Sequence, residues 1–310
     1  MNPKHPVYIV SKGRWETQFT SQYLAKMGVS HYVVVEAQEY DRYAAAKTEQ
    51  AMLLVLDAQF QRDYETCDDL GETKSKGPGA ARNFAWAHAV SLGASWHWVM
   101  DDNIKGFYRL YRNIKTPVAT GTIFRCMEDF VERYENVAMA GPNYFMMAKR
   151  KDKIPPFVLN TRIYSCNLIR NDVPYRWRGR YNEDTDLSLR MLKDCWCTVQ
   201  FNAFLQMKLT TQTVKGGCND DFYKVEGTKP KSEMLVRLHP DVAELVWKWE
   251  RWHHQVDYAP FKQTKLIRKP GVVVPEGVNN YGMVLEIDPD PIADVPHDAE
   301  ADSVTCGASA

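Results

Sequence analysis

The sequence has no uninterrupted apolar run of the roughly 18 residues that a membrane-spanning helix needs. Its first residues, MNPKHPVYIV, also lack the long apolar stretch and the small-residue cleavage site of a secretory signal. The seven cysteines are odd in number and scattered, without a Cys-x-x-Cys pair, which argues against a zinc site or a disulfide framework. These absences predict a cytosolic protein with no membrane segment.

The chain lacks a net charge, but its charges are unevenly distributed. All 310 residues together hold 39 basic and 39 acidic side chains. Residues 286–310 hold seven Asp or Glu, no Lys or Arg and no aromatic residue, so we expect a disordered acidic tail. The remaining 1–285 hold 39 basic against 32 acidic residues, a surplus of 7. That surplus permits a polyanionic partner without requiring one.

Apolar segments alternate with helical patterns over the first hundred residues. We expect strands at 5–10, 32–36 and 96–100, and helices at 19–27 and 80–92 that end at Gly28 and Gly93. The run 51–57 is expected to be a third strand, although so short an apolar run also fits a helix. Strands that alternate with helices in this way are typical of a parallel, doubly wound sheet.

The pattern changes after residue 103. We expect a helix that begins at Thr122, another at about 184–193, and strands in VAMAGP, RIYSCNLI, CWCTVQF and AFLQMKL. Pro240 suits the first position of a late helix whose apolar face would hold Val242, Leu245, Val246 and Trp249. No internal repeat or linker divides the chain, which favours a single α/β domain over 1–285 followed by the tail 286–310.

The stretch SWHWVMDDN joins an apolar strand to Asp101, Asp102 and Asn103. Adjacent carboxylates repel each other and are costly to desolvate unless a positive group lies between them. One interpretation is a plain turn, since Asp and Asn favour turns. The other is a metal or phosphate site, because open α/β sheets bind ligands at the carboxyl ends of their strands.

The segment KGPGAARN lies one helix upstream of this strand. A glycine-rich turn at a helix N-terminus, here Gly77 and Gly79, presents unpaired N–H groups and a positive dipole end to an anion. Arg82 adds a guanidinium that can bind a diphosphate. A tight turn that merely starts a helix explains the glycines equally well. Together with the acidic strand end, however, the turn could hold a nucleotide diphosphate and its divalent cation.

Two further segments combine charge with a predicted element. GRYNEDTDLSLRML places Glu183, Asp184 and Asp186 in the first turn of a helix, where they could simply offset the helix dipole. NDVPYRWRGRY interleaves arginines with aromatic residues, as in proteins that bind single strands or flipped bases, or forms a solvated loop anchored by one tryptophan. The residues concerned are Tyr175, Arg176, Trp177, Arg178, Arg180 and Tyr181, and Lys149–Lys153 offers a second basic patch.

The order GPGAARN, then WVMDDN, resembles the nucleotide-sugar glycosyltransferases of the GT-A fold. The resemblance implies a Rossmann-like mixed sheet flanked by helices, with a donor-binding half at about 1–110 and an acceptor-binding half at about 111–285. It implies that Mn²⁺ or Mg²⁺ is held against the donor diphosphate by Asp101, Asp102 and Asn103, although Asn103 stands where the family has a second Asp and adds no charge. The implied donor-binding residues are Ser11, Arg14, Glu36, Gly79, Arg82, Asn83, Asp101 and Asp102.

The same resemblance assigns roles to a base and a histidine. In inverting members an acid of the second motif deprotonates the acceptor hydroxyl, which implies Asp184 as general base with Glu183 as its neighbour and substitute. A late-loop histidine often returns to the metal, which implies His239, with His253 and His254 as rivals.

Longer segments resemble the bacteriophage TET-associated glycosyltransferases over about residues 6–261. They are GPGAARNFAW, WVMDDNI, RIYSCNLIRNDVPYRWRGRYNEDTDLSLRML, TQTVKGGCNDDFY and KSEMLVRLHPD. That family is linked to TET-like dioxygenases and adds sugars to 5-hydroxymethylpyrimidines in phage DNA. The resemblance implies a metal-dependent hexosyltransferase of the infected bacterial cell that uses a UDP-sugar as donor and 5-hydroxymethylcytosine in DNA as acceptor.

Two other functions stay open on the sequence. One is a glycosyltransferase of the same fold that acts on a protein, glycan or small-molecule acceptor. The other is a catalytically silent homologue that binds nucleic acid, which the Asn at position 103 keeps open. A nucleotidyltransferase is disfavoured, because no glycine-rich nucleotide-activating loop follows the first strand.

Overall fold

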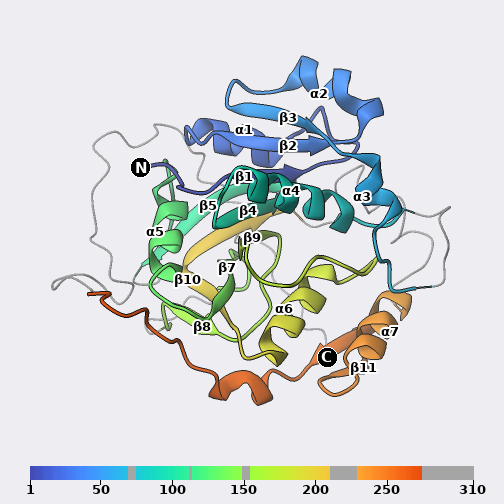
Figure 1. The fold of residues 1–310 in the computed structure, drawn as a ribbon, viewed down its shortest axis with the longest axis vertical. Coiled ribbons are helices and arrows are strands. Elements are labelled where there is room, and N and C mark those ends of the chain that lie inside the picture. Colours follow the sequence, from blue (N-terminus) through green and yellow to red (C-terminus); the bar gives the residue numbers. More distant parts are fainter. Residues whose placement is uncertain (69–74, 112–113, 149–153, 210–228, 274–310) are drawn as a thin grey trace, which may run out of the picture.

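Figure 1 shows the computed structural model of the chain, which describes residues 1–68, 75–111, 114–148, 154–209 and 229–273. The helices in these ranges are α1 (Phe19–Lys26), α2 (Tyr40–Ala46), α3 (Ala58–Arg62), α4 (Gly79–Ser91), α5 (Thr122–Val131), α6 (Glu183–Lys193) and α7 (Lys229–Leu238). The strands are β1 (Val7–Val10), β2 (His31–Val35), β3 (Ala51–Val55), β4 (Trp96–Asp101), β5 (Ile104–Tyr111), β6 (Ile114–Pro117), β7 (Val137–Tyr144), β8 (Phe157–Leu159), β9 (Cys166–Arg170), β10 (Cys197–Lys208), β11 (Ala243–Lys248) and β12 (Arg251–Val256).

One large mixed sheet runs through the described residues in the order β3-β2-β1-β4-β9-β7-β10-β5-β6, with β8 paired to β10. Strands β3, β2, β1 and β4 are parallel to one another, and β7 is parallel to β10. Strand β9 is antiparallel to both β4 and β7. The expected α/β architecture of a mixed sheet flanked by helices is confirmed.

Helices cover both faces of this sheet because successive side chains of a strand point to opposite faces. Val7 and Ile9 of β1 belong to a core formed with α1 and α5, whereas Tyr8 and Val10 belong to a second core formed with α4 and α6. Strand β1 is buried along its whole length, as expected of a parallel strand covered on both faces. Among the described residues, no helix is long and apolar enough to cross a membrane.

The elements of the first hundred residues are confirmed, including Gly28 and Gly93, which follow α1 and α4 with positive φ. Two expected strands of the second half are one continuous strand, β10. The late helix from Pro240 is wrong: this segment is a two-stranded antiparallel hairpin, β11–β12, and the helix α7 precedes it. The acidic tail and the Lys149–Lys153 patch lie outside the described residues.

The order of β1, β2 and β4 places three strand ends side by side. Because β1 lies between β2 and β4 and is parallel to both, Val10, Val35 and Asp101 reach the same edge of the sheet. The chain crosses to β2 through α1, on one face of the sheet, and reaches β4 through α4, on the other. Such a switch point leaves a crevice beyond the strand ends, where α/β proteins bind ligands.

Candidate functional site

A cleft of about 670 Å³ opens at this switch point. It is formed by the segments that follow β1, β2 and β4, the turn before α4, the start of α6, the end of β10 and one residue of β12. Many residues predicted from the sequence line it: Ser11, Arg14, Glu36, Gly77, Arg82, Asp101, Asp102, Asn103, Arg180, Tyr181, Glu183, Asp184 and His254. The first acidic motif and the second therefore meet in one cleft.

Asp101 is held between two cations. Arg82 donates to its Oδ1 at 2.7 Å, and Lys208, at the end of β10, donates to its Oδ2 at 2.6 Å. Burial alone would raise the pKa of Asp101, but the charges of Lys208 and Arg82 outweigh it and hold the pKa well below its usual range. Asp101 is therefore a permanently ionised carboxylate that fixes two cations in the cleft.

Asp102 contacts a different set of residues, in the segment that follows β1. Its Oδ2 accepts from the Ser11 hydroxyl at 2.7 Å, and its Oδ1 forms an ion pair with Arg14. Tyr43 on α2 contacts the same Ser11 hydroxyl at 2.7 Å. Burial raises the pKa of Asp102, and the nearby Arg14 charge opposes that shift. The predicted trio of Ser11, Arg14 and Asp102 thus forms one buried cluster.

Arg82 connects the two acidic motifs. Besides Asp101, its guanidinium contacts Glu183 Oε1 at 3.1 Å, and the Trp177 ring lies 4.6 Å below it. Arg82 is 3% exposed, so its charge acts where solvent screens little. One buried cation therefore fixes the position of the strand-end carboxylate relative to the start of α6.

Glu183 and Asp184 differ in what holds them. Glu183 is paired with Arg82, whereas the side chain of Asp184 accepts only from the Thr185 N–H, at 2.8 Å, among the described contacts. Burial raises the pKa of both acids, the charge of Arg82 opposes both shifts, and the proximity of Asp184 adds to that of Glu183. Asp184 is therefore the acid of the two that Arg82 does not hold in a direct ion pair.

The expected divalent cation finds no ready ligand set among the described residues. Both oxygens of Asp101 and both of Asp102 already accept from cations or a hydroxyl, and no three His, Cys, Asp or Glu side chains there converge as metal ligands do. Asn103 Oδ1 is buried without a hydrogen-bond partner, but it is a single neutral oxygen. In this arrangement the residues do not fit a resident metal ion, and metal binding stays a prediction.

Gly79 and Asn83, predicted to bind the donor, have other contacts. A Cβ on Gly79 would lie 1.8 Å from the Tyr64 hydroxyl, which donates to Gly179 O at 2.7 Å. Asn83 exchanges two hydrogen bonds of 2.9 Å with the backbone of Trp177. Neither residue lines the cleft. They join α4 to the 175–181 segment and so position Arg82 instead.

Glu36, at the end of β2, does line the cleft as predicted. Lys12 pairs with its Oε1 at 3.2 Å, and Gln61 donates to the same oxygen at 3.0 Å. The turn before α4 contributes Gly77, whose φ of +80° and 2.7 Å Cβ distance to Arg180 O leave room for glycine alone.

The three histidines proposed as metal ligands lie in different places. His239 is 1% exposed, and its Nε2 contacts Asp186 Oδ1 at 2.9 Å, away from the cleft lining. His253 packs against the Trp249 ring at 5.4 Å. His254 alone lines the cleft, where burial and the nearby Lys231 charge lower its pKa to about 4. The preference for His239 over His254 is therefore not supported by the geometry.

The 175–181 segment does not form the predicted acceptor surface. Trp177 is 2% exposed beneath Arg82, and Arg180 is 1% exposed and paired with Asp68 at 2.6 Å. Arg178 pairs with Asp186, and the guanidinium of Arg176 lies 4.6 Å from the Trp86 ring. The Tyr175 hydroxyl donates to Asp194. These groups bind other parts of the same chain, so the segment is a support for the cleft.

Several lining residues were missed by sequence reasoning. They come from strands and loops distant from either motif: Tyr144, Tyr164, Ser165, Lys208 and Lys231. Lys208 also donates to the Ser165 hydroxyl at 2.8 Å, which in turn contacts Tyr144 at 2.8 Å. The only local signal was a lysine at the end of an otherwise apolar strand.

One family model matches the chain. It is described as TET-Associated Glycosyltransferase and covers residues 5–217, about two thirds of the sequence. The match includes the strand ends, Arg82 and the start of α6, and it ends before the β11–β12 hairpin. No curated protein matches the chain.

Proposed function

The chain belongs to the TET-associated glycosyltransferases, and from that premise we propose that it transfers a sugar from a UDP-sugar to the hydroxymethyl oxygen of 5-hydroxymethylcytosine in DNA. The observation that carries the proposal is the single guanidinium of Arg82, which contacts Asp101 on the donor side and Glu183 beside the general base. A transfer reaction needs this proximity, because the leaving diphosphate and the attacking hydroxyl lie on opposite sides of one carbon atom.

The donor is proposed to lie over the carboxyl ends of β1 and β4. Its diphosphate would face Lys208 and Arg82, whose positive charges are already oriented by Asp101. Preorganised cations stabilise the negative charge that grows on the leaving diphosphate, and they do so strongly where water is excluded. The base and ribose would extend toward Glu36, Ser11 and Arg14.

The acceptor step is proposed to run through Asp184. Its carboxylate takes the proton from the hydroxymethyl group as that oxygen forms a bond to the anomeric carbon, and the bond from that carbon to the diphosphate breaks with its electron pair. Glu183 holds the guanidinium of Arg82 beside the reacting groups, and Glu183 does not compete with Asp184 for the acceptor proton. The step inverts the anomeric configuration.

The hydroxymethylated base itself must come from an oxidation. We propose that a TET-like dioxygenase supplies it, which is the functional association that the family description carries. The present chain would then act on DNA after that oxidation.

The test is incubation of the protein with 5-hydroxymethylcytosine DNA and a panel of nucleotide sugars, followed by mass analysis of the released nucleosides. A hexose added to hydroxymethylcytosine, and lost in Asp184→Asn, supports the proposal. Hydrolysis of a donor without transfer to DNA would favour a non-DNA acceptor. DNA binding without any donor hydrolysis would favour a silent homologue.

A further inference from the structure

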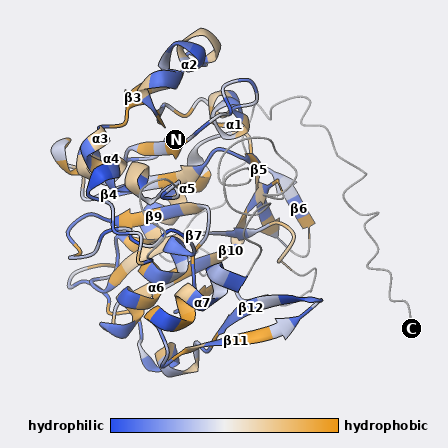
Figure 2. Cartoon of the chain, turned by 90° about the vertical axis from the view of Figure 1, so that its right-hand side faces the viewer, coloured by the Kyte–Doolittle hydropathy of each residue, from blue (hydrophilic) through white to orange (hydrophobic). Residues whose placement is uncertain are grey.

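The β11–β12 hairpin presents exposed tryptophans that the proposed chemistry does not use. Three of the nine tryptophans of the chain lie within it, and Trp247 and Trp249 are 59% and 80% exposed. A folded core needs buried tryptophans, so two exposed ones in a single hairpin indicate a binding surface. Figure 2 shows the hairpin projecting from the body of the protein.

The turn holds its tryptophan in a conformation that side chains rarely adopt. Lys248 pairs with Arg251, so Trp249 and Glu250 form a two-residue loop, with φ of +50° and +58°. Tight turns of this kind favour Asn and Gly at these positions, and a bulky aromatic residue there costs free energy. The contact with His253 leaves Trp249 80% exposed, so burial does not offset that cost, which points to a role outside the fold.

Cations flank these rings. Lys248 donates to Gln255 at 2.5 Å and Arg251 to His253 at 3.2 Å, and in the described part of the chain neither contacts a carboxylate. Lys229, which pairs with Glu233 at 3.3 Å, lies 5.9 Å from the Trp252 ring. Glu250 is the one acidic side chain in the loop itself. Exposed rings beside Lys248 and Arg251, which contact no carboxylate among the described residues, are the combination that binds bases by stacking and phosphates by charge.

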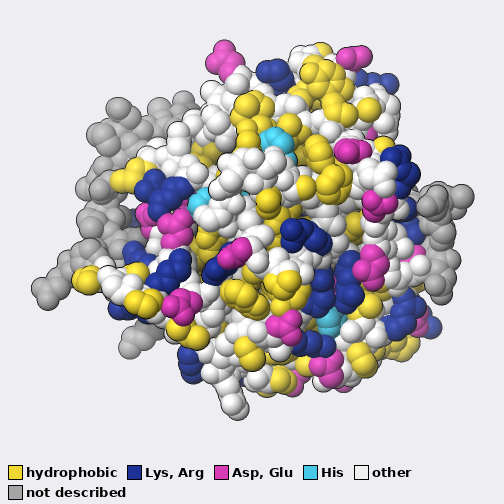
Figure 3. All heavy atoms as spheres, in the orientation of Figure 1, with side chains coloured by type: hydrophobic (Ala, Val, Ile, Leu, Met, Phe, Trp, Pro, Cys, Tyr) yellow, Lys and Arg dark blue, Asp and Glu magenta, His cyan; other side chains and the backbone are white. Residues whose placement is uncertain are grey.

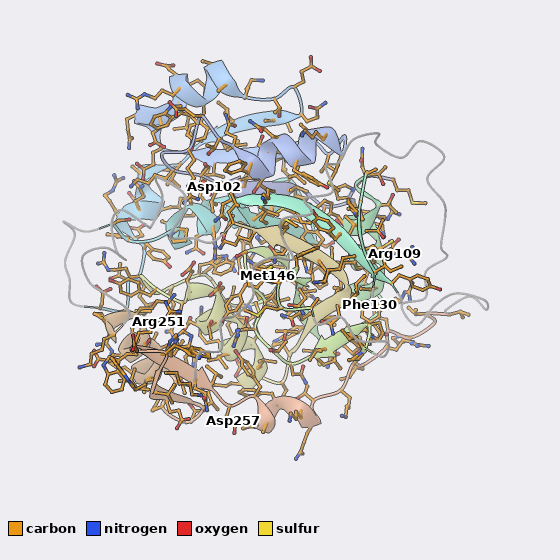
Figure 4. The ribbon with its side chains drawn as sticks, turned by 180° about the vertical axis from the view of Figure 1, so that it is seen from behind. Asp102, Arg109, Phe130, Met146, Arg251 and Asp257 are labelled. Carbon is orange, nitrogen blue, oxygen red and sulfur yellow. The ribbon has the colours of Figure 1, made fainter. Side chains whose placement is uncertain are left out.

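The hairpin is continuous with the cleft. His254 on β12 lines the cleft, and the pairing of Leu245 with His254 and of Trp247 with Trp252 puts all four on one face of the hairpin. At about 3.4 Å per residue, the Trp247–Trp252 pair lies about 7 Å from His254, or about two nucleotide steps. Figure 4 labels Arg251 on this hairpin and Asp102 at the cleft, both in the left half of that view.

We propose that the β11–β12 hairpin is the DNA-binding element of this protein, with Trp247 and Trp249 stacking on bases next to the modified nucleotide and Lys248 and Arg251 contacting its phosphates. The inference rests on the proposed function for the identity of the polymer. It replaces the 175–181 segment, whose aromatic and basic groups are occupied within the chain.

The experiment measures binding apart from catalysis. Fluorescence anisotropy with a labelled hydroxymethylcytosine oligonucleotide compares wild type with Trp247→Ala/Trp249→Ala, with the stacking-competent Phe double variant, and with Tyr40→Ala, an exposed aromatic residue on α2. We expect DNA affinity to fall by roughly tenfold for each tryptophan lost, to recover largely with Phe, and to stay unchanged in Tyr40→Ala. Lys248→Ala/Arg251→Ala should lower the salt dependence of binding by about two units of slope.

UDP binding and thermal unfolding, measured on the same variants, should match wild type, which excludes a folding defect. Wild-type DNA affinity in the double alanine variant, while wild type glycosylates DNA, overturns the hairpin inference and leaves the proposed function standing. A wild-type protein that neither binds nor glycosylates DNA overturns both. A change in oligomeric state without a change in DNA affinity makes the hairpin a contact between copies and also overturns the inference.

Discussion

At the scale of single residues, the cleft separates two adjacent acids by their partners. Glu183 is held by Arg82, while Asp184 contacts only the backbone N–H of Thr185 among the described residues. A cation lowers the basicity of a carboxylate, and Arg82, Lys231 and Lys208 all act on Asp184 in this way, but Arg82 also holds Glu183 in a direct ion pair. The two neighbours in the sequence are therefore expected to fail in different ways when changed.

Asp184→Asn is expected to lower kcat by roughly 10²–10⁴-fold while UDP binding stays close to wild type. Glu183→Gln should cost less in kcat and more in donor affinity, because it releases Arg82 from one of its two carboxylates. Steady-state kinetics together with calorimetric titration of UDP separate the two effects. A larger loss of kcat in Glu183→Gln than in Asp184→Asn would transfer the role of base to Glu183.

The pH dependence follows from the same pair. Burial and the neighbouring acid raise the pKa of Glu183 to about 7, and burial raises that of Asp184. A base whose pKa is raised stays protonated to a higher pH, so kcat/KM should fall at a pH above the range where an ordinary carboxylate titrates. A pH–rate profile from pH 4 to 9 measures it. A profile flat down to pH 5 would contradict the assignment.

Lys208 gives the sharpest test of the metal. We expect wild type to retain measurable transfer in excess chelator, because Lys208 and Arg82 already bring two cations to Asp101. Lys208→Met should lose this activity and regain part of it with Mn²⁺, since a carboxylate oxygen becomes free to bind the ion. Lys4→Met, at a lysine outside the cleft that pairs with Glu132, is the control. Complete, reversible loss of wild-type activity in chelator would instead establish the metal requirement expected from the sequence.

At the scale of elements, the strands that are buried on both faces were predicted correctly from the sequence, and the more exposed hairpin was not. Strands β1 and β4 were predictable because parallel strands covered on both faces are continuous apolar runs. The β11–β12 hairpin was not, because its apolar residues also fit helical spacing and its turn, Trp249–Glu250, lacks the usual Asn or Gly.

The same reasoning explains the outcome at the cleft. Asp101, Arg82 and Asp184 were found because each lies at the end of a recognisable element. Lys208 was missed, and His254 was ranked behind His239, because distant strands bring both to the cleft and no local pattern records that approach. Trp177 and Arg180 were expected on an acceptor surface, but both are buried, because exposure cannot be read from the order of residues.

Helix α6 depends on a buried charge cluster. Asp186 is 0% exposed and contacts His239 at 2.9 Å, Arg190 at 2.8 Å and Arg178 at 3.2 Å. Removing one partner of a buried pair leaves the others uncompensated, so Asp186→Asn should cost about 3–5 kcal/mol of unfolding free energy. Asp241→Asn, in an exposed pair with Lys193, should cost about 0–1 kcal/mol. Denaturant unfolding measures both changes.

The pKa of Asp186 in this cluster is shifted in the opposite direction to that of the proposed base, Asp184. Its partners lower the pKa of Asp186 despite burial, so its stabilisation is fully present above the unfolded pKa of roughly 3.9 and disappears as the pH falls through the lower folded value. The difference in stability between wild type and Asp186→Asn should therefore shrink in acid. An equal difference at pH 7 and pH 3 would contradict this account.

At the scale of the whole molecule, charge is mixed over the surface and uneven along the chain. Figure 3 shows Lys and Arg side chains interspersed with Asp and Glu on the face it displays. A chain that ends at residue 285 would carry seven more positive than negative groups. We expect it to bind DNA more tightly than the full chain at low salt, with the difference vanishing as salt screens the charges. Equal affinities at low salt would show that the acidic tail does not compete with DNA.

Because Gly79 and Tyr64 are in close contact, the substitutions tolerated at position 79 depend on the residue at position 64. Because a single added carbon at 79 would overlap the phenol oxygen at 1.8 Å, Gly79→Ala is damaging only while the tyrosine is present. Shortening position 64 first, by Tyr64→Ala, opens the space, so the order in which the two substitutions arise decides which intermediates survive. The combined variant should be more stable than the Gly79→Ala variant alone, a case of sign epistasis between residues fifteen positions apart.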